Sequence, residues 1–339
     1  LGMAMGFISA KNIKSNFTFD VIDGEIYEKR AIKITKYLMI AGVVGLIISY
    51  IGMGFIPMFA EDPISAKLFR GQYQEPYLRV AVIFRTAFFI LSTVMPIACV
   101  ICYKYRSKLF FFLVIAALVL MALSLIRSGA FMGVVIAFAI VMSFKSRSHF
   151  IILMTLLVGI FVLSSFFYYI VGVRTYTGEK SVWEIITAGT PDIPDHLDFM
   201  VHFDQTPKWT YGRTIYGGLL TGHYEWNPAV YTLIMVNPGK EINEIGSGGL
   251  RLPLPLWGYV SFQWVGVIIF SFFTGLFYGV FLRLVKNLFL KFKSILIRTV
   301  IMIALGATYG MLVNFTQLSI FTVPPAILSL TYLYRFRIK

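Results

Sequence analysis

The chain has 339 residues, of which 58% are hydrophobic and only 14% are charged, and its mean hydropathy is +0.78. Soluble domains carry about 25% charged residues, so this composition excludes a soluble enzyme, a disordered chain and a collagen-like fibre. Two cysteines are too few for a disulfide framework or a multi-cysteine metal cage. Long apolar runs argue against an outer-membrane barrel and predict an all-α polytopic membrane protein.

Apolar runs without charge mark the expected membrane spans, because a helix needs about 20 such residues to cross about 30 Å of hydrocarbon. Residues 1–9 read as the last turns of a further helix, so we expect an N-terminal piece to precede them. Together these segments predict a single transmembrane domain over residues 1–339. The expected whole spans are 37–60, 80–103, 109–126, 128–144, 150–173, 253–282, 297–313 and 316–334.

The net charge of +14 is explained by the way basic residues sort between the two sides of these spans. The loops of one side hold 19 of the 30 basic residues and only four of the 16 acids. Membrane proteins collect Lys and Arg on the cytoplasmic side, so this side is predicted to be cytoplasmic. The charge therefore gives no reason to expect a nucleic-acid partner, and the long segment 174–252 is placed outside, in the periplasm or its equivalent.

The outer segment 174–252 is longer than ordinary connections, and loops of this length usually carry function. Residues 229–236 have roughly helical apolar spacing. A second short helix is expected after Pro191 and Pro194, opened by Asp192, Asp195 and Asp198, because acids favour a helix N-terminus. We expect an amphipathic, partly helical lid on the outer membrane surface. Its many aromatic rings suit sugar stacking, and they are equally typical of an interfacial aromatic belt.

Arginines on the predicted outer side are the strongest functional signal. Arg127 lies at the tip between two short spans, and Arg85 lies about a turn and a half inside its span. Arg251 directly precedes a charge-free run, and Arg174 directly follows another. Burying an arginine this close to lipid costs several kcal/mol unless it is paired or snorkels to lipid phosphates. Because Arg binds phosphate in a bidentate manner, these side chains predict a site for a lipid-linked phosphate or diphosphate.

The other polar residues of the outer loop carry weaker signals. His196, His202 and His223 lie near acids, but their spacing is not that of a zinc motif, so no metal is expected. His223 and Glu225, in the stretch GLLTGHYEWNP, are candidates for proton transfer. The sequence contains no phosphate-binding loop, no dinucleotide fingerprint and no nucleophile elbow, so no nucleotide cofactor or serine hydrolysis is expected.

Three stretches resemble parts of one family. SLIRSGAFMGVVIAFAIV (residues 124–141) resembles the arginine tip and the following apolar helix of O-antigen polymerases and ligases. PKWTYGRTIYGGLL (207–220) resembles the G-x-T-x-x-x-x-L element in the outer loop of repeat-unit polymerases, and residues 248–279 resemble the re-entry of their chain into the membrane. The chain is thus similar to the Wzy-type O-antigen polymerase (oligosaccharide repeat-unit polymerase) family over about half its length.

This resemblance implies a GT-C-like helical bundle in the bacterial inner membrane, with the long loop in the periplasm. It implies a glycosyltransferase that needs neither metal nor cofactor, acts on undecaprenyl-diphosphate-linked glycans among the membrane lipids, and works with a chain-length regulator. Arg127 matches the arginine of the tip, Arg251 sits where the family places a basic or polar residue, and Arg213 falls in the G-x-T element. His223 comes too early to match the signature histidine of the ligases, which favours polymerase over ligase.

The resulting hypothesis is that two lipid-linked glycans meet at the outer membrane face, where one is transferred to a hydroxyl of the other. Arg127 and Arg251 would hold the leaving diphosphate, as catalytic groups. Arg85, Arg174 and Arg213 would bind it as well, and Glu225 or His223 would take the proton. The alternatives are an O-antigen ligase and a flippase or transporter of lipid-linked oligosaccharide. A transporter should carry polar residues through the midplane, whereas spans 37–60, 150–173 and 253–282 are free of charge.

Overall fold

The described part of the chain is built from helices. A computed structural model describes residues 1–13, 24–142, 192–220, 224–245, 252–319 and isolated positions (151, 155, 158–159, 249–250, 322–324, 326–327 and 329). Across these residues the only bridge between extended segments joins Gly218 and Ser319, so the all-α prediction is confirmed for them. The span predicted at 150–173 lies almost wholly outside the described residues, and the one predicted at 316–334 is described only at 316–319, 322–324, 326–327 and 329.

Four of the described helical segments are long and apolar enough to cross a membrane. They lie where the sequence predicted the spans 37–60, 80–103, 253–282 and 297–313, and the chain is therefore a membrane protein. A shorter apolar helix falls within the predicted span 109–126. The four candidate spans are Glu25–Phe59, Gly71–Tyr105, Leu254–Asn287 and Ile295–Val313, and the shorter helix is Lys108–Leu123.

The chain divides into two compact units, and the single transmembrane domain over residues 1–339 stays a prediction. We call Leu1–Ile22, Pro191–Lys293 and Ile301–Lys339 the first unit. The second unit consists of Asp23–Thr190 and Ser294–Val300. Each unit is described by itself below.

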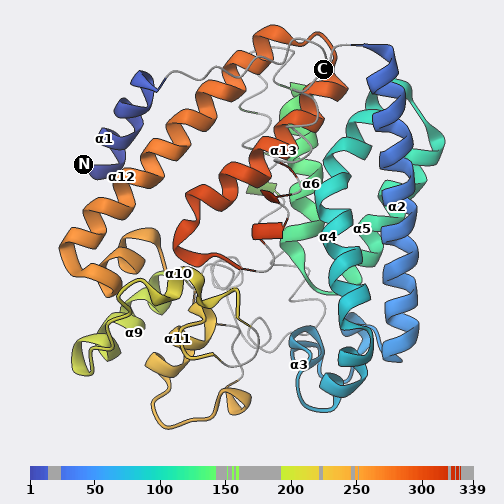
Figure 1. Cartoon of the computed structure of the whole chain (residues 1–339). Helices are drawn as coiled ribbons and strands as arrows, with labels where there is room; N and C mark the ends of the chain where they lie inside the picture. The colour runs from blue at the N-terminus through green and yellow to red at the C-terminus, as the bar shows by residue number, and fades with distance from the viewer. Residues whose placement is uncertain are drawn as a thin grey trace. The chain divides into compact units, whose positions relative to one another are not determined.

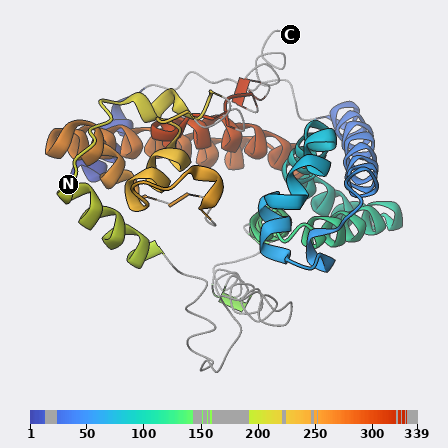
Figure 2. The same cartoon turned by 90° about the horizontal axis from the view of Figure 1, so that it is seen from below.

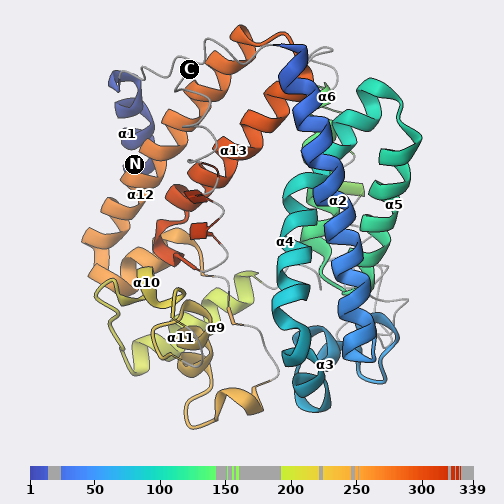
Figure 3. The same ribbon diagram turned by 45° about the vertical axis from the view of Figure 1, so that its right-hand side comes forward.

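The second unit is a group of helices packed side by side (Figures 1 and 3). Its helices are α2 (Glu25–Met53), α3 (Pro63–Leu68), α4 (Gln74–Tyr105), α5 (Lys108–Leu123) and α6 (Arg127–Met142). Glycines allow α2 to approach α4 closely, since a Cβ atom at Gly42 would lie 2.6 Å from Leu91 and one at Gly52 would lie 2.7 Å from Val80. Because higher numbers in α2 meet lower numbers in α4, the two helices are antiparallel.

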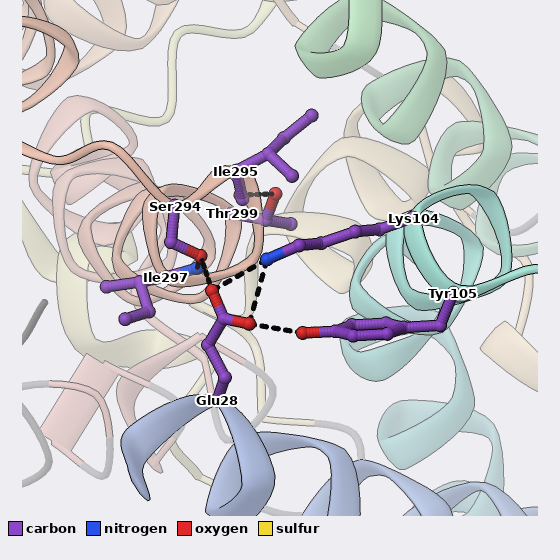
Figure 4. A network of polar contacts seen from close by, with 7 residues as sticks. All are labelled: Glu28, Lys104, Tyr105, Ser294, Ile295, Ile297 and Thr299. Atoms are coloured by element: carbon purple, nitrogen blue, oxygen red, sulfur yellow. Dashed lines mark hydrogen bonds and ion pairs between the residues drawn. The ribbon is translucent and has the colours of Figure 1, made fainter. Parts of the chain in front are cut away.

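A polar network joins three segments of the second unit around the carboxylate of Glu28 (Figure 4). Lys104 Nζ donates to both oxygens of Glu28, at 2.7 and 2.8 Å, and the hydroxyls of Tyr105 and Ser294 donate to the same carboxylate. Ser294 directly precedes α13 (Ile295–Val313), and its Oγ accepts from the backbone N–H of Ile297 at 3.4 Å, as an N-cap does. Glu28 thereby ties the first turns of α2 to the end of α4 and the start of α13.

The first unit contains α1 (Gly2–Ser9), which packs along α12 (Leu254–Lys291) in the same direction (Figure 1). The contact depends on glycine, because a Cβ atom at Gly6 would overlap the carbonyl of Phe272 and one at Gly275 would overlap the carbonyl of Met3. The end of α1 is capped by Arg283, whose guanidinium donates to the carbonyls of Ala10 and Ile13. The pair Gly275–Gly279 therefore serves close packing within the chain, as expected of such spacing.

Residues of the predicted outer loop form helices around the start of α12 (Figures 1 and 2). α9 (Asp192–Gln205) begins at the acidic residue where a helix was predicted, and that prediction is confirmed. α11 (Pro228–Val236) covers the predicted apolar stretch, and Asn227 caps it by accepting from the N–H of Ala229 at 3.1 Å. A shorter helix, α10 (Arg213–Gly217), lies between them in the chain.

α12 is interrupted near its start, which the apolar sequence did not predict. Phe262 (φ −144°, ψ 28°) and Gln263 (φ 54°, ψ −145°) leave the helical region, so a short helix precedes the long one. A Cβ atom at Gly258 would lie 2.6 Å from the carbonyl oxygen of Gly266, whereas residues eight apart in a straight helix are about 12 Å apart. The chain therefore folds back on itself, and only the part from Trp264 onward continues as one helix.

Candidate functional site

An aromatic core holds the outer-loop helices against the start of α12. Phe199 and Phe203 of α9 are 0% and 1% exposed, and they lie one turn apart on the same face of the helix. Tyr231 of α11 and Trp257 of α12 are buried in the same cluster. This packing explains why α9 and α11 form here, since each buries one apolar face against the other elements.

The segment between α9 and α10 is anchored at two points. The backbone N–H of Thr210 donates to Val260 at 2.9 Å, and the hydroxyls of Thr210 and Ser261 lie 2.9 Å apart. The hydroxyl of Tyr231 donates to the carbonyl of Lys208 at 2.8 Å, and burial raises the pKa of Tyr231, so it remains protonated as this donor. Lys208 and the residues after it are therefore held in place by the core.

Two cations lie over one indole ring next to this segment. Lys208 Nζ is 5.0 Å and Arg213 Cζ is 4.9 Å from the ring centroid of Trp226, which is only 6% exposed. Lys208 also pairs with Glu225 at 3.0 Å. A cation within about 6 Å of a Trp face is attracted by the ring quadrupole. We call these four residues, Lys208, Arg213, Glu225 and Trp226, the cation–indole cluster.

The ion pair in this cluster changes the chemistry of Glu225. A hydrogen bond from Lys208, followed by its charge, lowers the pKa of Glu225 below that of an ordinary glutamate, and the nearby charge of Arg213 acts in the same direction. Glu225 is therefore a carboxylate at neutral pH, able to accept a proton but weakly basic.

The G-x-T element has a structural explanation in α10. Gly212 has a φ of 76°, a conformation that favours glycine, and Thr214 is 1% exposed. Gly217 lies so close to Trp226 that a Cβ atom would overlap its carbonyl. The backbone of Ile215 accepts from Leu318 at 2.9 Å. The fixed residues of the element thus hold α10 in place, and the side chain of Arg213 is exposed.

In the second unit, Arg85 lies on α4 within a stack of aromatic rings. Its Nε donates to the hydroxyl of Tyr77 at 2.6 Å, and its Cζ is 5.4 Å from the same ring. Tyr77 stacks on Phe69 with centroids 3.7 Å apart, and both rings contact Phe84 edge-on. Because side chains on a helix lean toward its N-terminus, Arg85 is directed toward the first turns of α4.

Arg127 is the first residue of α6, as its predicted place at the tip requires, but its side chain lies outside what the structure describes. The turn before it is well anchored. Ser124 is fully buried, and its hydroxyl donates to the carbonyl of Met121 at 2.7 Å. Leu125 has a φ of 58°, which reverses the chain between α5 and α6.

The structure brings together two of the predicted site residues, Arg213 and Glu225, in the cation–indole cluster. Arg85 belongs to the other unit, and the backbone of Arg127 is placed there too. Three predicted site residues lie outside the described part of the chain: Arg174, His223 and Arg251. Among the described residues, no three His, Cys, Asp or Glu side chains are grouped so that they could hold a metal ion.

Sequence reasoning missed Lys208, Trp226 and Tyr77 as partners of the predicted residues. Lys208 and Trp226 are 18 positions apart in an irregular segment, so no periodicity connects them. Tyr77 lies three residues before the predicted span 80–103, and only the structure, in which α4 begins at Gln74, places it on the helix that carries Arg85.

No protein-family model matches this chain, and neither a curated protein nor a solved structure matches it. The likeness to repeat-unit polymerases therefore stays a prediction from the sequence motifs.

Proposed function

We propose that this protein polymerises undecaprenyl-diphosphate-linked oligosaccharide repeat units into O-antigen or a related surface polysaccharide. The transfer would take place at the outer face of the bacterial inner membrane, in a GT-C-like enzyme with its long loop in the periplasm. One observation carries the proposal. Two residues of the second unit, Arg85 and Arg127, lie at nearly the same level along the helix axes, further from the outer surface than the first residue of α4.

Tyr50 of α2 contacts both α4 and α5, so it allows the levels of Arg85 and Arg127 to be compared. Its ring contacts Phe84 of α4 edge-on, with centroids 6.2 Å apart, and its hydroxyl donates to the carbonyl of Leu120 in α5 at 2.6 Å. Arg85 directly follows Phe84, and Arg127 follows Leu120 after the α5–α6 turn. Both arginines therefore lie close to the level of Tyr50.

The packing of α6 on α4 agrees with this depth. Gly133 lies against Met95, since a Cβ atom there would be 3.0 Å from the Met95 side chain. Arg127 precedes Gly133 by six residues, about 9 Å, and Arg85 precedes Met95 by ten residues, about 15 Å. With α4 and α6 running in the same direction, the two arginines differ in depth by only about 6 Å.

The length of α5 supports a position below the headgroups. α5 has 16 residues and is about 24 Å long, less than the roughly 30 Å of hydrocarbon. α4 continues outward from Phe84 by ten residues, about 15 Å. An arginine at this depth is costly unless it is matched by an anion or reaches the headgroups, and the diphosphate of a polyprenyl lipid would supply two phosphates at this level.

In the proposed reaction, a hydroxyl of the acceptor glycan attacks the anomeric carbon of the donor glycan. The bond from that carbon to the diphosphate oxygen breaks, and the diphosphate leaves with the electron pair. Arg127 and Arg251, with Arg85 and Arg174, would stabilise the developing charge, as preorganised donors do. Glu225 or His223 would accept the hydroxyl proton. A chain-length regulator is the proposed partner.

The experiment is a surface-polysaccharide gel from a strain that lacks this gene and carries wild type, Arg127→Ala or Arg79→Ala. Arg79 is the matched control, because it is exposed and already paired with Glu75 at 2.7 Å. We expect the deletion to leave a single repeat unit on the core, wild type and Arg79→Ala to restore the ladder, and Arg127→Ala to fail at normal protein level.

Other outcomes would overturn the proposal. Loss of every repeat unit would indicate a ligase or a flippase. An unchanged ladder in the deletion strain would exclude this polymer as the product. A full ladder with Arg127→Ala would remove the arginine from the mechanism.

A further inference from the structure

Arg213 differs from the other cation of the cation–indole cluster in its partners. Lys208 is matched by Glu225 at 3.0 Å. The guanidinium of Arg213 makes no hydrogen bond and no salt bridge to any described side chain, and the residue is exposed. The cluster therefore carries one net positive charge, and that charge lies at Arg213 on the protein surface.

Arg213 is also held in a defined position. α10 is fixed on one side by the contact of Gly217 with the Trp226 carbonyl and on the other by the hydrogen bond from Leu318 to Ile215. The indole then supports the guanidinium at 4.9 Å. A guanidinium over an aromatic ring keeps its in-plane N–H groups directed outward, where they can bind a carboxylate with two parallel hydrogen bonds.

An exposed aromatic ring lies beside this cation. Tyr216 follows Arg213 by three residues on α10 and is 45% exposed. The side chain of Tyr224 lies close enough to interact with that of Tyr216. A ring of this kind offers an apolar face to the C–H face of a sugar and a polar edge to its hydroxyls.

We propose that Arg213, Trp226 and Tyr216 form a subsite for an acidic sugar of the glycan. Arg213 binds the carboxylate of a hexuronic acid or a similar residue, Trp226 positions the guanidinium, and Tyr216 stacks on the sugar ring. This inference rests on the proposed function, since the glycan is the substrate there, and it gives the substrate class: a repeat unit that contains a carboxylate. The sequence alone assigned Arg213 to the diphosphate instead.

The test measures binding without turnover. It can therefore fail while the polymerase experiment succeeds, and it can succeed while the polymerase experiment fails. Purified full-length protein in nanodiscs of zwitterionic lipid is titrated with methyl glucuronide, methyl glucoside or inorganic phosphate, and binding is followed by saturation-transfer NMR. We expect the glucuronide to bind more tightly than the glucoside. Arg213→Gln should weaken the glucuronide about tenfold and leave the glucoside unchanged.

Two further variants separate the contributions of the side chains. Arg213→Lys keeps the charge but loses the planar fork, so its affinity for the glucuronide should lie between those of wild type and Arg213→Gln. Tyr216→Ala should weaken both sugars to a similar degree. Arg79→Gln, which removes an exposed arginine of the second unit, should change neither, and the tryptophan fluorescence of each variant checks that it is folded.

Three results would overturn the inference. Equal binding of glucuronide and glucoside would show that the carboxylate is not recognised. Unchanged glucuronide binding in Arg213→Gln would place the sugar elsewhere. Phosphate that binds more tightly than the glucuronide in an Arg213-dependent manner would assign this residue to the diphosphate of the donor.

Discussion

The carboxylate of Glu225 shows how one neighbour sets the chemistry of a residue. Lys208 donates to it at 3.0 Å, while about half of the glutamate side chain remains exposed. An exposed ion pair contributes little to stability, but this one lowers the pKa of Glu225. This makes Glu225 a better partner for a cation than a strong general base.

We therefore predict that Glu225 titrates below an ordinary glutamate and that Lys208→Met returns its pKa toward the usual range. Since the folded pKa is lowered, the pair stabilises the protein at pH values above about 4.3, the pKa of the unfolded chain, and this contribution is lost as the pH falls through the folded pKa. Carboxyl ¹³C shifts of labelled glutamate in the solubilised protein measure the effect. Equal titration in wild type and Lys208→Met would mean that the pair does not form in solution.

At the scale of elements, the contact of α1 with α12 depends on glycine. Gly6→Ala should lower the free energy of unfolding by about 1–3 kcal/mol, because the added methyl group overlaps the Phe272 carbonyl and separates the helices. The matched control is Gly306→Ala in α13, where a Cβ atom meets nothing within 4 Å. That change should stabilise by about 0.5–1 kcal/mol through helix propensity.

Thermal unfolding followed by tryptophan fluorescence compares these two variants with wild type. If Gly6→Ala and Gly306→Ala have the same melting temperature, α1 does not pack on α12 at this distance.

The network around Glu28 connects α2, α4 and the start of α13, so its loss should lower the stability of all three segments. Glu28→Ala removes the acceptor of Lys104, Tyr105 and Ser294, and we expect it to destabilise by about 1.5–3 kcal/mol, as for hydrogen bonds to a charged group. Glu25→Ala is the control, since the Glu25–Lys29 pair lies in solvent and its removal should leave the melting temperature unchanged. Equal melting of the two variants would show that the network adds no stability.

The sequence predicted the helices of the long spans because apolar length and the absence of charge determine them locally. It also predicted α9 from the acids Asp192, Asp195 and Asp198 near Pro191 and Pro194. The break at Phe262 and Gln263 could not be predicted, because both residues lie inside a charge-free run and the break depends on contact between Gly258 and Gly266. The same limit holds for the site: Arg213 was identified as a candidate, but its support by Trp226 depends on a fold of the loop without periodicity.

At the scale of the whole molecule, the distribution of charge makes a prediction about orientation. Lys240 belongs to the predicted outer loop, and Lys293 belongs to the predicted cytoplasmic side. In a background with Cys99→Ala and Cys102→Ala, a cysteine at position 240 should react in intact cells with a membrane-impermeant maleimide. A cysteine at position 293 should react only after the membrane is permeabilised. The opposite result would invert the orientation and place the recessed arginines on the cytoplasmic face.

The short α5 has a consequence for the surrounding lipid. Exposed apolar side chains such as Phe111, Phe112 and Val119 lie on this helix, and its length of about 24 Å is less than the usual hydrocarbon thickness. A bilayer beside a short helix thins to match it, at a cost of a fraction of a kcal/mol per Å. We therefore expect the membrane next to α5 to thin, which would lower the headgroups of neighbouring lipids toward the level of Arg85 and shorten the path of the proposed lipid-linked diphosphate to it.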